Sequence, residues 1–253
     1  MSKRTVIYQG SQEEAKVQME YFSYSENGYL KEQAMVKNNG DSLITWNLYG
    51  NYSTSSGFQI LPTDRKLYLG TSHGRKILKS YNFSYRPLEV LPGWRQYFNV
   101  LARELQLDEN YKPIERIDYN YYDKYGNILE KVENNSKHTV FLWSHYGQNP
   151  RARIENATYQ EVSFVLGCKL EDLSALTVYT PILDNDFRIK LPCARVFTYW
   201  CNQRNSITTS TAPNGQSTYY TYDKRGRLIQ TYQLNEEGRM EILQLNNYHI
   251  VNE

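Results

Sequence analysis

Four histidines are the first residues of this 253-residue chain to consider for acid–base or metal chemistry, and they are His73, His138, His145 and His249. No two of them are four residues apart, the spacing at which a helix presents two ligands to one metal ion. His145 and His249 occupy similar positions in two related segments, as surface residues of a repeat would. We therefore expect no metal site among the histidines.

Two carboxylate clusters, Asp108–Glu109 and Glu115–Asp118, lie in a polar stretch of the chain. Glycoside hydrolysis needs two carboxylates held across a cleft, and neighbours in a polar segment are typical of a solvated surface. Ser72 precedes His73 without the Gly-x-Ser-x-Gly turn of a hydrolase nucleophile, and there is no glycine-rich phosphate loop. The sequence thus predicts a protein that is not an enzyme and needs no cofactor.

The remaining metal-binding residue types also lack the spacing of a site. The segment 184–186 (Asp-Asn-Asp) has neither the glycine nor the downstream glutamate of a calcium loop, so it predicts a turn. The three cysteines, Cys168, Cys193 and Cys201, include no C-x-x-C pair, which argues against zinc. A bridge between Cys193 and Cys201 is the alternative to the favoured interpretation, which is buried thiols.

Composition predicts a mainly β protein. The chain has 24 tyrosines against 8 phenylalanines, and tyrosine favours strands while its hydroxyl needs a partner or water. The formal net charge of +2 argues against a nucleic-acid partner, which requires a dense cationic surface. No apolar run is long enough for a transmembrane segment, and the N-terminus shows no signal peptide, so a cytoplasmic location stays open.

A repeated phrase organises the chain. Segments 24–30, 122–128 and 222–228 each read Tyr, three residues, Gly, one residue and then an aliphatic residue. Downstream of each glycine come an Asn/Gly-containing turn signal and then apolar residues alternating toward a tyrosine, which is the strand period. Each copy is therefore expected to form a strand, a tight glycine turn, a strand, a second turn and a third strand.

The signature residues have structural roles in this interpretation. The tyrosine ends a strand, the aspartate accepts backbone N–H groups of the turn, and the glycine supplies a positive φ. Ser25 replaces the aspartate in the first copy, which predicts a weaker turn there. The signature comprises Tyr24, Gly28, Tyr122, Asp123, Gly126, Tyr222, Asp223, Gly226 and Arg227.

The blocks between the copies are less regular. Residues 51–112 predict short strands at Lys66–Leu69 and Lys76–Phe83 and a helix at Trp94–Leu107, whose apolar residues have near-helical spacing. In residues 150–215, Asn156 is expected to cap a short helix that Gly167 ends. A second short helix near Leu170 and a strand at 194–201 follow.

The segment Gly215–Leu228, with its paired tyrosines, Tyr-Asp and Gly-Arg-Leu, resembles a YD repeat of the RHS class. The resemblance covers about residues 117–250, and the phrases at 125–127, 140–144 and 156–159 are similar to Bacteroidetes YD-repeat proteins. It implies an antiparallel sheet of successive hairpins, an open strip or partial shell, at a cell surface or in a secreted protein. Three copies are too few to close a shell, and residue 253 follows the last copy without an autocleavage motif.

These expectations combine into one architecture. We expect a mainly β fold with an antiparallel sheet of YD-repeat hairpins and two or three short inserted helices. Residues 1–253 form one unit in this interpretation, and the alternative is a degenerate region 1–112 followed by a better-matched region 113–253.

The predicted function is that of a non-enzymatic structural and interaction module. Its partner is another protein or a second copy, bound through sheet edges or a Tyr/Trp-rich face. The alternatives are a carbohydrate-binding surface module and the carrier portion of an RHS-type secreted toxin. The candidate binding aromatics are Trp46, Trp143, Tyr146 and Tyr248.

Overall fold

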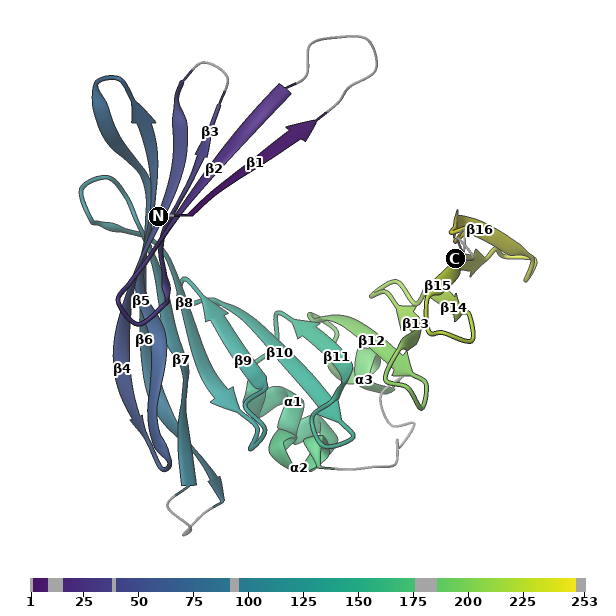
Figure 1. Ribbon diagram of the computed structural model, residues 1–253. Coiled ribbons are helices and arrows are strands. Elements are labelled where there is room, and N and C mark those ends of the chain that lie inside the picture. The colour runs from purple at the N-terminus through teal and green to yellow at the C-terminus, as the bar shows by residue number, and fades with distance from the viewer. Residues whose placement is uncertain (1, 9–15, 38–39, 92–95, 176–185, 249–253) are drawn as a thin grey trace. The chain divides into compact units, whose positions relative to one another are not determined.

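The chain folds into an antiparallel sheet whose strands follow one another in sequence order, each hydrogen-bonded to the next. The computed structural model describes residues 2–8, 16–37, 40–91, 96–175 and 186–248 (Figure 1). The sixteen strands are β1 (Ser2–Tyr8), β2 (Lys16–Tyr24), β3 (Leu30–Val36), β4 (Ser42–Thr54), β5 (Gly57–Thr71), β6 (Gly74–Leu91), β7 (Gln96–Leu107), β8 (Pro113–Tyr122), β9 (Ile128–Glu133), β10 (Lys137–Ser144), β11 (Asn149–Glu155), β12 (Arg195–Cys201), β13 (Ile207–Thr211), β14 (Ser217–Tyr222), β15 (Leu228–Leu234) and β16 (Met240–Leu245). The expected mainly β fold with an open antiparallel sheet is confirmed.

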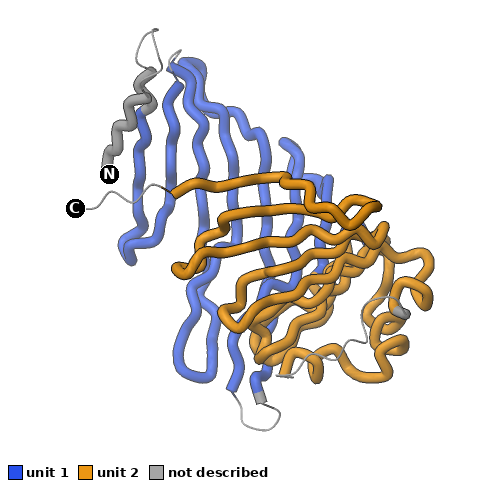
Figure 2. Tube along the Cα trace, turned by 90° about the vertical axis from the view of Figure 1, so that its right-hand side faces the viewer, with its two compact units in different colours: residues 1–118, 133–135 blue, residues 119–132, 136–253 orange. Residues whose placement is uncertain are grey.

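Three short helices are inserted between β11 and β12: α1 (Tyr159–Leu166), α2 (Leu170–Ser174) and α3 (Asp186–Lys190). The chain divides into two compact units, shown in different colours in Figure 2. Unit 1 comprises residues 1–118 and 133–135, and unit 2 comprises residues 119–132 and 136–253. All three helices belong to unit 2.

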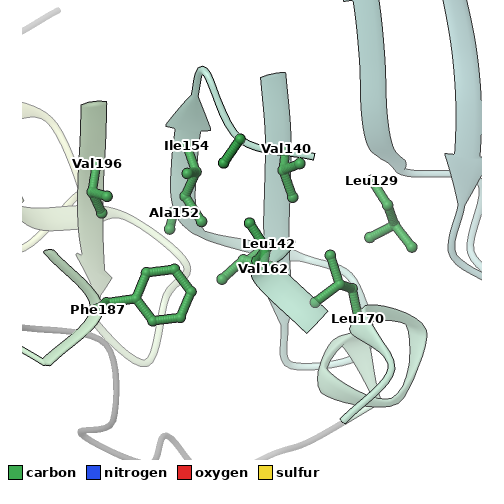
Figure 3. Packing of buried hydrophobic residues seen from close by; sticks show 10 residues of the cluster. Leu129, Val140, Leu142, Ala152, Ile154, Val162, Leu170, Phe187 and Val196 are labelled. Carbon is green, nitrogen blue, oxygen red and sulfur yellow. The ribbon is translucent and has the colours of Figure 1, made fainter. Parts of the chain in front are cut away.

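The hydrophobic core of unit 2 lies between the sheet and the helices. Strands β9 to β12 contribute Leu129, Val140, Leu142, Ala152, Ile154 and Val196, all at most 2% exposed. Val162 of α1, Leu170 of α2 and Phe187 of α3 face these strand residues, and the Phe187 ring points toward them (Figure 3). Burial of these side chains attaches each short helix to the sheet, because helices of five to eight residues are not stable alone.

Unit 1 has little apolar core. Among its described residues, Ile44 and Val100 are the buried apolar side chains, and Asn47 and Asn99 are buried with them. The Asn99 amide donates to the Ser53 carbonyl at 2.7 Å, and its backbone N–H donates to Gln59 Oε1 at 2.9 Å. Hydrogen bonds from side chain to backbone therefore supplement the strand ladder in unit 1.

The predicted helix at Trp94–Leu107 is wrong over its described part, since residues 96–107 form strand β7. β7 pairs with the 18-residue β6, from Leu91 opposite Gln96 to Ser80 opposite Leu107. The apolar spacing fits a helix, but pairing along a long neighbouring strand outweighs that local preference. The strands predicted at 66–69 and 76–83 are parts of the longer β5 and β6.

The predicted cap of the first inserted helix is also wrong, because Thr158 caps α1 in place of Asn156. Glu161 N–H donates to Thr158 Oγ1 at 3.2 Å, and Thr158 N–H donates to Glu161 Oε2 at 2.8 Å, which completes a capping box. Asn156 has a φ of 62° and lies in the preceding turn. The predicted end of this helix at Gly167 is confirmed by its φ of 69°.

The other local expectations have mixed outcomes. Leu170 begins α2, as predicted, whereas Asp186 begins a helix and not a turn, and residues 184 and 185 lie outside the described residues. All three cysteines are free thiols, so Cys193 and Cys201 are not bridged. Cys193 is exposed, which corrects the expectation of a buried thiol, and the other two are half-buried.

Candidate functional site

The three signature turns share one backbone geometry. Tyr24, Tyr122 and Tyr222 end strands β2, β8 and β14. The residue after each tyrosine exchanges hydrogen bonds with the turn: Asp123 N–H donates to the Asn127 carbonyl at 3.0 Å, and Gly126 N–H donates to the Asp123 carbonyl at 3.1 Å. The same two bonds recur around Ser25 and Asp223, and Gly28, Gly126 and Gly226 have φ of 81°, 87° and 81°. A residue with a Cβ takes this conformation only at a cost in free energy.

The aspartate side chain makes two of these turns stronger than the third. Asp123 Oδ1 accepts the backbone N–H groups of Tyr125 at 3.0 Å and Asn127 at 2.8 Å. Asp223 Oδ1 accepts the equivalent pair from residues 225 and 227 at 2.8 and 2.9 Å. In the first copy, Ser25 Oγ accepts one N–H, from Tyr29 at 3.1 Å. The replacement by serine therefore removes one hydrogen bond and one charge from the first turn.

The Asp223 turn is expected to weaken in acid. The Arg227 backbone N–H, and then the Arg227 guanidinium at 2.7 Å, lower the pKa of the Asp223 carboxyl below its ordinary value. Because the folded pKa lies below the unfolded one, the stabilisation is complete above the unfolded pKa of about 3.9 and is lost as the pH falls through the folded pKa. An NMR titration of the Asp223 carboxyl should give a midpoint below about 3.9, and Arg227→Gln should raise it. A midpoint unchanged by Arg227→Gln would contradict this assignment.

A tyrosine or tryptophan closes the turn in each copy; Tyr49 and Trp143 lie in the third strand of their copies, and Tyr248 follows the end of β16. The Tyr49 hydroxyl donates to the Leu30 carbonyl at 3.0 Å, and the Tyr248 hydroxyl donates to the Leu228 carbonyl at 2.9 Å. In the second copy Trp143 Nε1 donates to the Ile128 carbonyl at 2.9 Å. The acceptor is in every case the aliphatic residue two places after the signature glycine.

The candidate binding aromatics are thereby distributed over the three turns. Trp46 belongs to the first copy, Trp143 and Tyr146 to the second and Tyr248 to the third. The Tyr146 ring centroid lies 6.5 Å from that of Tyr125, and the Arg227 guanidinium lies 4.5 Å from the Tyr248 ring centroid. Trp46 lies in unit 1 and the other three aromatics lie in unit 2.

Exposure differs sharply between equivalent signature tyrosines. Tyr24 is 52% exposed, whereas Tyr122 is 8% exposed and the Tyr222 hydroxyl donates to the Ile207 carbonyl at 2.7 Å. Grooves of about 490 and 500 Å³ lie beside the first and third turns. Beside the second turn Gly147 approaches Tyr125 and Asn127 so closely that a Cβ there would clash. The first and third turns are thus open where the second is filled.

The same turn occurs at places where the sequence shows no glycine. Asp108 and Asn202 each begin such a turn, and their side-chain oxygens accept two backbone N–H groups as Asp123 does. Tyr111 and Asn205 occupy the glycine position with φ of 62°. Sequence analysis missed both turns because it required glycine, and the Asp/Asn at the first position is the signal that finds them.

A buried carboxylate in unit 2 was also missed. Glu130 is 2% exposed and accepts hydrogen bonds from the Asn120 amide at 3.1 Å and the Tyr159 backbone N–H at 2.9 Å. Its other contact is His138 Nδ1 at 3.1 Å. These contacts attach the first turn of α1 to the sheet, and the charge is stabilised at a helix N-terminus.

A large apolar surface continues from the covered part of the sheet onto its last strands. Residues that pair directly across neighbouring strands lie on the same face of the sheet, and so do residues two apart along one strand. The helices cover the face that carries Ala152 and Ile154, and Ala152 pairs with Thr198. The same face continues through the pairs Thr198–Thr211, Thr209–Tyr219, Tyr219–Tyr232 and Tyr232–Ile242. No described helix covers this face over β14 to β16. We call it the C-terminal apolar face, and it comprises Tyr219, Tyr232, Leu234, Met240, Ile242 and Leu245.

The C-terminal apolar face adjoins an unpaired strand. Leu234, Met240, Ile242 and Leu245 are between 44% and 59% exposed. Within the described residues β16 pairs on one side only, with β15, so its other side presents free backbone N–H and C=O groups. Such an edge is a template for pairing with another strand.

The described part of the chain holds neither a group of three His, Cys, Asp or Glu residues arranged for a metal ion nor a helix with the length and apolarity to cross a bilayer.

No protein-family model and no curated protein matches this chain. The YD-repeat resemblance therefore stays a prediction from the residues.

Several solved structures are similar at low scores. The TcdB2-TccC3 structure without its hypervariable C-terminal region matches at 10% identity and a TM-score of 0.38, over 95% of this chain and 11% of that one. The Photorhabdus luminescens Tc holotoxin pore matches at 10% identity and 0.25, over 97% and 12%. A porin-like protein from Bacteroides uniformis matches at 14% identity and 0.23, over 91% and 92%. The chain thus spans about a tenth of the first two, and scores this low carry no inference about function.

Proposed function

We propose that this protein is a non-enzymatic structural and interaction module that joins another polypeptide chain to its sheet through β16. The observation that supports the proposal is the coincidence of an unpaired edge and an apolar face on one strand. Within the described residues β16 has free backbone groups along its edge, and Met240, Ile242 and Leu245 point from it to the face that no described helix covers. An added strand pairs with the edge, and its apolar side chains extend the face.

The occupant that we propose is a strand of a partner protein or of a second copy. Glu241 is the one charged residue within β16, so little charge on the strand opposes pairing. An extracellular or cell-surface setting is part of the proposal and follows from the YD-repeat resemblance. A secreted toxin carrier, the other alternative from that resemblance, would use the same edge.

The test is association of the full chain measured by sedimentation and chemical crosslinking. Ile242→Lys and Leu245→Lys put charges on the C-terminal apolar face and should abolish association seen with the wild-type chain. Phe164→Lys on α1 is the matched control, because Phe164 is 88% exposed on a helix away from the edge. The proposal would be overturned if the wild-type chain stays monomeric and forms no crosslink through β16, either alone or with the proteins that adjacent genes encode.

A further inference from the structure

The groove beside the first signature turn is a second surface that strand pairing does not use. We call it the first-turn groove, and the residues that matter for its chemistry are Tyr24, Tyr29, Trp46, Tyr49, Asn27 and Asn51. Its volume of about 490 Å³ falls within the range of small-ligand sites, about 300–1,000 Å³.

The ring of Tyr24 is exposed, although the equivalent rings of the other two copies are more buried. The equivalent Tyr122 is 8% exposed and the equivalent Tyr222 is half-buried, so the repeat itself permits burial of this ring. Tyr24 is 52% exposed and Tyr29 is 37% exposed, both at the groove. Two large ring surfaces therefore stay in water at one turn, where a ligand that stacks on them would gain their burial.

The rings on the strand side of the groove are held in place. The Tyr49 hydroxyl is bound to the Leu30 carbonyl at 3.0 Å, and its ring centroid lies 5.4 Å from that of Tyr29. Lys66 Nζ lies 5.7 Å from the Trp46 ring centroid. A preformed aromatic surface loses little conformational entropy when a ligand binds.

The polar residues of the groove are neutral amides with unused hydrogen-bonding capacity. Asn27 and Asn51 are exposed, and neither side-chain amide has a hydrogen-bond partner in the described part of the chain. Each amide offers both a donor and an acceptor, which is what a ligand rich in hydroxyl groups requires. The charged residues that line the groove are one acid and one base, Glu26 and Lys31, so its lining has no net charge to select a strongly charged ligand.

From these contacts we propose that the first-turn groove binds a neutral oligosaccharide. A sugar ring presents an apolar C–H face and a rim of hydroxyls; the face stacks on Tyr24 and Tyr29, and the hydroxyls bond to Asn27 and Asn51. The turn beside this groove is the one in which Ser25 replaces the aspartate that the other two copies have.

The experiment measures binding of the full chain to an array of neutral oligosaccharides, acidic oligosaccharides and a proline-rich peptide, followed by calorimetry on the best binder. Tyr24→Ala and Asn51→Ala should each weaken binding of the neutral oligosaccharide at least tenfold. Phe58→Ala is the matched control in unit 1, because Phe58 is 77% exposed and does not line the groove; it should bind as the wild type does. Circular dichroism of each variant verifies that it is folded.

Three outcomes would overturn the proposal: no neutral oligosaccharide binds, Tyr24→Ala binds as tightly as Phe58→Ala, or the peptide or acidic sugars bind in preference. The result is independent of the β16 edge. Ile242→Lys should leave oligosaccharide binding unchanged whether or not it abolishes association between chains.

Discussion

Asp123→Ala is expected to destabilise unit 2 by about 3 kcal/mol, because the substitution removes a fully buried acceptor of three hydrogen bonds. Asp123 is fully buried and accepts two backbone N–H groups, from Tyr125 and Asn127, through Oδ1. Oδ2 accepts the Asn127 amide at 2.9 Å, and that amide also donates to the Gly147 carbonyl at 2.9 Å. Loss of the carboxylate thus affects two turns at once. Urea denaturation followed by hydrogen exchange over residues 119–175 measures the change.

Two variants make this prediction specific. Asp223→Ala removes the same acceptor from an equivalent turn that is open to water, so its effect should be clearly smaller. Asp123→Asn should be intermediate, because Asn202 and Asn235 hold equivalent turns with an amide oxygen. Equal losses for Asp123→Ala and Asp223→Ala would show that burial of the turn is not what makes the carboxylate important.

Phe187→Ala is expected to cost about 3–5 kcal/mol, the usual range for removing a buried phenylalanine ring. Phe187 is 1% exposed, and its ring packs against residues from β10 to β12. It is the one residue of α3 within the core cluster, so its loss should release this five-residue helix from β12.

Ile189→Ala is the control on the same helix. Ile189 is 74% exposed, and its truncation removes little buried surface, so the free energy of unfolding should change by less than about 0.5 kcal/mol. Similar thermal midpoints for Phe187→Ala and Ile189→Ala would contradict the assignment of Phe187 to the core.

The hairpins could be predicted from sequence because their determinants are local. A glycine with positive φ and an aspartate that accepts turn N–H groups lie within five residues of each other, and strand ends follow from them. The capping box of α1 was equally local: Thr158 and Glu161 have the expected spacing, and choosing Asn156 overlooked it.

The features that sequence analysis missed depend on distant partners. Residues 96–107 have an apolar spacing that fits a helix, and pairing with β6 and β8 makes them a strand. The C-terminal apolar face follows from the register of five successive strand pairings, because residues such as Ile242 and Ala152 come to one face only once each pairing is known. The exposure of Tyr24 is likewise a property of its neighbours, since the same motif buries Tyr122.

The strictly sequential pairing of the sixteen strands has a kinetic consequence. Every ladder joins segments that adjoin one another along the backbone, apart from β11 and β12, which the helices separate. Chains of this kind acquire structure by nearest-neighbour growth, in which one formed hairpin lowers the entropic barrier for the next. Amide protection should accordingly rise from the outermost ladders inward, and the β11–β12 junction, with its long loop to close, should be the slowest step of assembly.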